Sequence, residues 1–175
     1  QVALLDRRRF GRVWVLSDEE LQRHPRLLAL GPEPMGPGLS AGFLMRRLGR
    51  SRAAVHGRML EQDIAAGVGN IAIIEACHIA GVHPRIPCNQ MDSEAWWLLI
   101  FALRDHFEKL LCHPIGQPMV YISEGRPEPL FLCYGREGEA CHRCASRIIR
   151  EVHAGRPAFY CRVCQPLSGG SRVPG

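Results

Sequence analysis

Apolar residues recur at helical spacing through the middle of the chain. The repeat predicts three helices, at Ala41–Leu48, at roughly Ala53–Ala66 and at Ile71–Ala80. A longer, more apolar stretch at about Ser93–Leu111, preceded by Asp92 as N-cap, predicts a fourth helix that forms the core. The large apolar residues of this helix, which we expect to pack in the interior rather than stack on bases, are Trp96, Trp97, Ile100, Phe101, Phe107 and Leu110.

The N-terminal part of the chain has a different pattern. Residues 1–6 and 12–16 combine apolar, aromatic and β-branched side chains, which predicts two strands that pair. Ser17 followed by Glu20 is typical of a capping box, so we expect a short helix directly after it that ends before Pro25.

Composition divides the chain into segments of different character. Prolines and glycines crowd into residues 31–38, which predicts a linker. Further on, Met119–Ile122 and Leu130–Cys133 are strand-like. The predicted segments are a remnant of an N-terminal β-domain with a short helix (1–30), the linker (31–38), a helical domain (39–132), a cysteine-rich module (133–167) and a frayed tail (168–175).

Charge and composition suit a polyanion partner without establishing one. The formal charge is +5, and Lys109 is the single lysine among 22 basic residues. The planar guanidinium of arginine matches phosphate and guanine edges, although a GC-rich coding bias would give the same composition. The longest apolar run, Ala95–Leu103, is far shorter than the roughly 20 residues that span a bilayer. Without a secretory signal pattern, we expect a cytosolic or nuclear protein.

Four cysteines carry the strongest chemical signal. Cys141 and Cys144 form one Cys-x-x-Cys pair, Cys161 and Cys164 form another, and 16 residues separate the pairs. This spacing predicts one tetrahedral zinc ion held by four thiolates, with Ser146–Tyr160 as a hairpin between the knuckles. Two disulfides are the alternative, but no oxidising compartment is indicated. A site closed by four sulfurs is structural, since no position is open for an activated water.

Several other residues have both a plain and a functional interpretation. Arg156, just past the hairpin tip at Ala154-Gly155, is either a solvated surface arginine or a phosphate contact. The turn from Gly67 through Gly69 to Asn70 is either simple turn chemistry with Asn70 as N-cap or a phosphate site at a helix start. Glu75 and His78 receive no chemical role, and Cys77, Cys88, Cys112 and Cys133 are expected to be small buried hydrophobes.

In chain order, the motifs resemble those of one enzyme family. They are Arg8-Arg9-Phe10-Gly11, Leu30-Gly-Pro-Glu-Pro34, Gly67-Val-Gly-Asn70-Ile with Glu75, Ala80-Gly-Val-His-Pro84, Tyr134-Gly-Arg-Glu-Gly-Glu139 and the four-cysteine hairpin. Together they resemble the formamidopyrimidine-DNA glycosylase/endonuclease VIII family, and more closely its formamidopyrimidine branch. The resemblance covers nearly all of residues 6–165. It implies a mainly α fold, with a helix-two-turns-helix bundle, a C-terminal β-hairpin zinc finger and a short N-terminal β remnant.

The resemblance implies base-excision repair of DNA and assigns residues to it. Such enzymes flip an oxidised base out of the duplex, excise it and cleave the abasic strand. Asn70, with Gly67 and Gly69, would hold phosphate near the flipped nucleotide, and Arg156 would clamp phosphate from the zinc hairpin. Arg8 would face the orphaned base and Phe10 would wedge into the stack.

The chain departs from the family pattern at several positions. The family's nucleophile is an N-terminal proline amine, whereas this sequence starts at Gln1, and Lys109 matches no catalytic position. We therefore assign no catalytic residue and leave open whether the chain is an enzyme. Other departures are His56 where a lysine commonly contacts DNA, Ala72 for tyrosine, Ala158 for threonine, and no Gly-Gly-Thr-Thr stretch after the core helix.

Three hypotheses follow. The first is the DNA-binding half of a glycosylase and abasic-site lyase that acts on oxidised bases in damaged double-stranded DNA. The alternative is a non-catalytic, zinc-containing paralogue that binds damaged DNA, and the third is a zinc ribbon that binds RNA or a protein. For the first we expect one structural Zn²⁺, no membrane contact, a monomer, and a cytoplasmic (bacterial nucleoid) or nuclear location.

Overall fold

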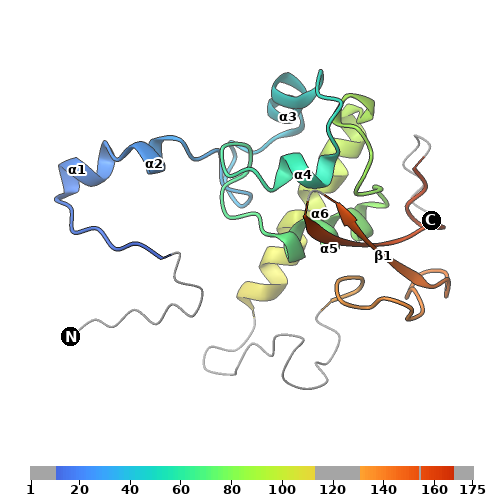
Figure 1. Cartoon of the computed structure of the whole chain (residues 1–175). Coiled ribbons are helices and arrows are strands. Elements are labelled where there is room, and N and C mark those ends of the chain that lie inside the picture. The colour runs from blue at the N-terminus through green and yellow to red at the C-terminus, as the bar shows by residue number, and fades with distance from the viewer. Residues whose placement is uncertain (1–10, 113–130, 154, 168–175) are drawn as a thin grey trace.

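A helical body and a β-hairpin that lies against it make up the described part of the protein. The computed structural model describes residues 11–112, 131–153 and 155–167 (Figure 1). Its elements are α1 (Asp18–Gln22), α2 (Pro25–Leu28), α3 (Ala41–Leu48), α4 (Val55–Met59), α5 (Asn70–Ala80), the 3₁₀ turn η1 (Cys88–Gln90), α6 (Ser93–Leu111), β1 (Ile148–His153) and β2 (Arg156–Cys161). The predicted mainly α class with a C-terminal hairpin is confirmed.

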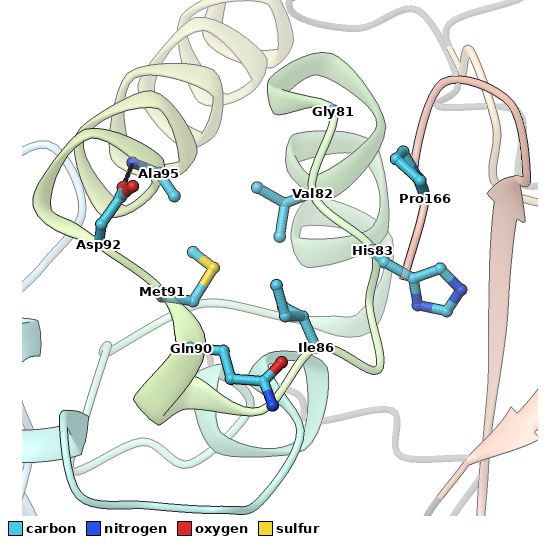
Figure 2. A pocket seen from close by; sticks show the side chains of 9 residues that line it. All are labelled: Gly81, Val82, His83, Ile86, Gln90, Met91, Asp92, Ala95 and Pro166. Atoms are coloured by element: carbon cyan, nitrogen blue, oxygen red, sulfur yellow. Dashed lines mark hydrogen bonds between the residues drawn. The ribbon is translucent and has the colours of Figure 1, made fainter. Parts of the chain in front are cut away.

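The core forms where α5 packs against α6, and α3 also packs against α6. Asp92 caps α6 as predicted, since its carboxylate accepts a hydrogen bond from the Ala95 amide at 2.7 Å (Figure 2). The helix α5 ends at Gly81, whose φ of 68° lies in the left-handed region that glycine adopts without strain. The largest fully buried side chains of the three helices are Leu44, Leu48, Ile73, Ile74, Trp96, Leu99 and Leu103.

Two aromatic residues of α6 lie outside this core. Trp96 is fully buried, but Trp97 and Phe101 are each 58% exposed and stack with ring centroids 5.6 Å apart. The expectation that the apolar residues of α6 all pack inside was therefore wrong for this pair. The sequence of α6 is apolar around most of its circumference, whereas α3 and α5 cover only part of it.

The helix α4 is shorter than predicted. It begins at Val55 and ends at Met59. Residues 60–66 continue as turns, with hydrogen bonds between residues three apart, such as the one from Ile64 N–H to the Glu61 carbonyl at 2.9 Å. The apolar spacing that predicted a longer helix is real, because Ile64 and Ala65 are buried. These two side chains reach the core from turns rather than from a continuation of α4.

The N-terminal segment confirms one prediction and contradicts another. The capping box at Ser17 and Glu20 is present, and α1 ends before Pro25. Pro25 opens a further short helix, α2, that we did not predict. Residues 12–16 form no strand, since no described strand lies alongside to take their hydrogen bonds. Figure 1 shows α1 and α2 extending away from the helical body.

The proline- and glycine-rich stretch at residues 31–38 is bound firmly to the helical body. The guanidinium of Arg104 on α6 donates to the carbonyls of Pro34, Gly36 and Leu39 at 2.8, 3.0 and 3.1 Å. Gly31 lies so close to the backbone that a Cβ there would come within 2.5 Å of the Asp63 carbonyl oxygen. This segment is therefore a packed connection.

The hairpin agrees with its prediction. The strands β1 and β2 pair antiparallel from Ile148 opposite Cys161 to His153 opposite Arg156. Gly155 in the tip has a φ of 74°. Residues 131–133, expected to be strand-like, are not a strand, and Cys112 is exposed rather than buried. Residues 1–6, Met119–Ile122 and the predicted tail 168–175 lie outside the described residues. No described helix is long and apolar enough to cross a bilayer.

The Arg104 contacts give a first prediction. Arg104→Ala removes the donors to three carbonyls, so the free energy of unfolding in urea should fall by about 1–3 kcal/mol. Arg46→Ala, on the exposed face of α3, is the matched control and should change it by less than about 0.5 kcal/mol. Equal effects of the two substitutions would show that the connection is not held through Arg104.

Candidate metal centre and nucleic-acid interface

A small cavity beside the start of α6 is not the site. It has a volume of about 30 Å³ and lies between the end of α5 and the start of α6. That volume holds a water molecule or two. Figure 2 shows Val82, Ile86 and Met91 around it, while the His83 ring points away from it. The candidate chemistry lies instead on the side of α5 that faces the hairpin.

The four predicted zinc ligands come together. The sulfurs of Cys141, Cys144, Cys161 and Cys164 all lie within 4.8 Å of one another. Two of the separations are 3.8 Å, from Cys141 to Cys164, and 3.4 Å, from Cys144 to Cys161. A tetrahedral ion with Zn–S bonds of about 2.3 Å places its sulfurs about 3.8 Å apart. The donor set therefore fits zinc in both chemistry and size.

The environment of the thiols also favours a metal. Hydrogen bonds from Ser146 lower the pKa of Cys144 to about 6, which favours the thiolate that binds zinc. Burial raises the pKa values of Cys161 and Cys164, so these two thiols lose their protons only when a cation balances the charge. Each pair lies on a turn, closed by Ala145 N–H to the Cys141 carbonyl and by Gln165 N–H to the Cys161 carbonyl, both at 2.9 Å.

A buried carboxylate on α5 anchors the cysteine module, defined as residues 131–167. Glu75 is 1% exposed. Its two oxygens accept the backbone N–H groups of Leu132 at 2.7 Å, Cys133 at 2.9 Å and Tyr134 at 2.6 Å. Burial raises the pKa of Glu75, whereas the three amides and Arg136 act in the opposite direction by stabilising the carboxylate. The residue that received no role from sequence holds the module in place.

The C-terminal end of α5 is joined to the same module. The side-chain oxygen of Gln165 accepts the Cys161 amide N–H at 2.9 Å and lies 3.1 Å from His78 Nδ1. Its amide group donates to the Val82 carbonyl at 2.8 Å. Arg143 donates to the carbonyls of His78 and Ile79, where the helix dipole favours a cation. Both Glu75 and His78, which received no chemical role from the sequence, are buried with hydrogen-bond partners that lie far away in the chain.

Asn70 joins the start of α5 to the hairpin. It was expected to be the N-cap, but Gly69 occupies that position and Asn70 is the first residue of the helix. Asn70 Oδ1 lies 2.7 Å from His56 Nε2 on α4, and Asn70 Nδ2 donates to the Pro157 carbonyl of β2 at 2.9 Å. The cap prediction was wrong because these longer-range bonds use both polar atoms of the side chain.

The remaining predicted contacts cluster around Asn70. Gly67 and Gly69 are exposed, and a Cβ at either would meet no atom within 4 Å, so this turn presents an open face. Arg156 is exposed and directly precedes Pro157, the partner of Asn70. The structure thus brings these predicted residues to one side of the molecule. Arg8 and Phe10 lie outside the described residues.

Two histidines belong to this cluster. His56 is fully buried, and its ring lies 6.0 Å from that of His153 at the end of β1. Burial is the main cause that lowers the pKa of His56, with further contributions from His153 and Arg156, while the bond to Asn70 acts in the opposite direction. Sequence reasoning noted His56 only as a departure from the family lysine, because nothing local indicates its bond to Asn70.

Comparison with known proteins supports both parts of the site. Residues 30–112 match a family model described as "Formamidopyrimidine-DNA glycosylase H2TH domain", and residues 138–167 match "Zinc finger found in FPG and IleRS". The formamidopyrimidine-DNA glycosylase of Novosphingobium aromaticivorans is 36% identical over 94% of this chain and 62% of its own length. That of Geobacillus kaustophilus is 32% identical over 91% of this chain and 60% of its own.

Solved structures agree with these relatives. The MutM (Fpg) protein of Thermus thermophilus is similar with a TM-score of 0.77 and 32% identity, over 91% of this chain and 62% of that one. Lactococcus lactis Fpg in complex with DNA containing an abasic site has a TM-score of 0.75 and 27% identity, over 86% of this chain and 57% of that one. This chain therefore spans about three fifths of the length of such proteins, and its four-cysteine cluster is the site of one structural zinc ion.

The zinc site gives a second prediction. Cys161→Ser should release the ion and unfold the hairpin while α3, α5 and α6 stay folded, because the helical core buries its own apolar residues. Zinc content by atomic emission and amide NMR spectra measure the two effects. Cys112→Ser, at an exposed cysteine outside the cluster, should retain the metal and the spectrum. Retention of stoichiometric zinc by the Cys161 variant would contradict the ligand assignment.

The Glu75 anchor gives a third prediction. Glu75→Gln keeps the size of the side chain but replaces one acceptor oxygen with a donor that faces backbone N–H groups. The free energy of unfolding should fall by about 2–3 kcal/mol in urea denaturation. Glu108→Gln, exposed on α6, should change it by less than about 0.5 kcal/mol. A tolerated Glu75 substitution would mean that the module docks through its apolar contacts alone.

Proposed function

Since the chain belongs to the formamidopyrimidine-DNA glycosylase/endonuclease VIII family, whose C-terminal half it represents, we propose that it binds damaged duplex DNA for a base-excision-repair glycosylase. The reaction would be removal of an oxidised base followed by cleavage of the abasic strand. In this proposal the described residues bind and orient DNA, and none of them is assigned the nucleophile.

One observation carries the proposal. Asn70 bridges the helical body and the zinc hairpin, and Arg156 lies beside its hairpin partner. The first turn of α5 has backbone N–H groups without intrahelical acceptors, and the exposed turn at Gly67 and Gly69 leaves space in front of them. Helix amides, a side-chain amide and an arginine on one face are the groups that hold phosphate. A DNA backbone that follows this face would touch all three.

The relatives support a damaged duplex as the ligand. The Lactococcus lactis protein is described in complex with DNA that contains an abasic site and with DNA that contains a Fapy-dG lesion. A chain with a formal charge of +5 and 21 arginines suits such a polyanion. The relatives are bacterial, and we therefore propose a location in the cytoplasm at the nucleoid. We further propose that the protein acts as a monomer.

A non-catalytic paralogue that binds damaged DNA is the second candidate. It is favoured by His56, which replaces a lysine common in the family. Lys109, the single lysine of the chain, forms an ion pair with the Asp105 carboxylate on α6. Borohydride trapping on abasic duplex DNA tests whether this chain itself supplies a nucleophile. Both candidates predict binding without a covalent adduct, and a trapped adduct would contradict the absence of an assigned nucleophile in either.

Affinity measurements test the proposed contacts. Asn70→Ala and Arg156→Ala should each weaken binding to a duplex with a tetrahydrofuran abasic analogue by about 1–3 kcal/mol in fluorescence anisotropy. Lys109→Ala removes a charge elsewhere and should leave the affinity within about twofold, as expected for a cation that touches no phosphate. Unchanged affinity in both site variants would exclude this face, and stronger binding to single-stranded RNA would favour the third hypothesis.

A further inference from the structure

The residue behind Asn70 is a histidine that DNA cannot reach directly. His56 has no exposed surface, and its ring lies against Asn70 on one side and near His153 on the other. We propose that His56 is a positioning residue: its Nε2–H fixes the orientation of the Asn70 amide and leaves one Asn70 N–H available for a DNA phosphate. This inference rests on the proposed function for the phosphate, but the orientation itself is a property of the free protein.

The chemistry of the three partners determines the orientation. The Pro157 carbonyl can only accept a hydrogen bond, so the atom of Asn70 that faces it at 2.9 Å must be the nitrogen. The atom that faces His56 at 2.7 Å is then the oxygen, which can only accept. His56 Nε2 must therefore carry the proton. Asn70 Nδ2 has two N–H groups, of which Pro157 takes one.

Without His56 the amide would be less well fixed. The bond to Pro157 alone allows the Asn70 side chain to pivot and leaves Asn70 Oδ1 without a partner from α4. Binding phosphate would then include the entropic cost of ordering the amide. A side chain held from two elements enters the complex already oriented, which is the benefit expected of a positioning residue.

His56 supplies direction rather than charge. Burial lowers the pKa of His56, and Coulombic contributions from His153 on β1 and Arg156 on β2 act in the same direction. Within the described residues Nδ1 is buried without a hydrogen-bond partner, so a second proton would lack an acceptor. The ring is thus neutral near pH 7, unlike a lysine at this position. A neutral positioning residue affects affinity without contributing to counterion release.

The experiment compares His56→Ala with His56→Gln in the zinc-loaded chain on the abasic-analogue duplex. The alanine variant should bind about five- to tenfold more weakly, whereas glutamine, whose nitrogen replaces Nε2 as donor, should stay within about twofold. The double variant His56→Ala/Asn70→Ala should bind the duplex no more weakly than Asn70→Ala alone, since both substitutions remove the same interaction. Additive losses, or a glutamine variant as weak as alanine, would overturn the proposal.

Salt dependence separates positioning from direct contact. Arg156→Ala should reduce the slope of log affinity against log salt by about one, as for a lost phosphate contact, whereas His56→Ala should leave it unchanged. A reduced slope in the His56 variant would mean that a charged ring touches the phosphate. Loss of stability in the alanine variant is controlled by comparing zinc content and urea unfolding in all variants.

NMR on the free wild-type chain decides the orientation independently of DNA. The ¹⁵N chemical shifts of the His56 ring should identify the neutral Nε2–H tautomer at pH 7, and the Asn70 side-chain amide signals should shift in His56→Ala but not in His56→Gln. An Nδ1–H tautomer would overturn the proposal even if DNA binds. If wild-type protein binds no duplex DNA but shows the Nε2–H tautomer, the proposed function fails and the positioning of Asn70 stands.

Discussion

The three backbone N–H groups that bind the Glu75 carboxylate are the interaction on which the rest of the structure depends. A carboxylate buried to this degree is costly unless its oxygens are satisfied, and here both are. The bonds join α5 to residues 132–134, at the start of the cysteine module. The same helix carries Asn70 at its start and His78 near its end, so one rigid element sets the distances among the exposed turn before Asn70, the anchor and the four-cysteine site.

The hairpin is also held along its length, which gives its tip a defined place. Glu151 accepts hydrogen bonds from Tyr160 at 2.7 Å and from Arg85 at 3.2 Å. The ring of His83 packs on that of Tyr160, with the two ring centroids 4.4 Å apart. Gln165 and Arg143 fix the metal end, and Asn70 fixes the tip end through Pro157. Under the proposed function, zinc would act on DNA binding through geometry: it closes the two Cys-x-x-Cys turns, and the strands between them carry Arg156 to the face where Asn70 lies.

Much of this arrangement could be predicted from sequence wherever a local rule decides it. The apolar periodicity predicted α3 and α6, the cysteine spacing predicted the metal site, and the Ser17 capping box predicted α1. Prediction failed where a partner distant in the sequence decides the outcome. Asn70 has the local signature of an N-cap, but its partners are 14 and 87 residues away. The exposure of Trp97 and the role of Glu75 depend likewise on which surfaces other segments cover.

The anchor at Glu75 also determines how this region can change during evolution. Because the carboxylate binds main-chain N–H groups, the side chains of Leu132, Cys133 and Tyr134 can drift without loss of these bonds. Proline is the exception, since it lacks the donor. Glu75 itself has no such freedom, because aspartate, the one other side chain with a carboxylate, is shorter by a methylene group. The anchor therefore fixes the identity of the single helical residue, whereas the three anchored positions are limited only by packing, which is tight at the fully buried Cys133 and at Tyr134 beside Phe159.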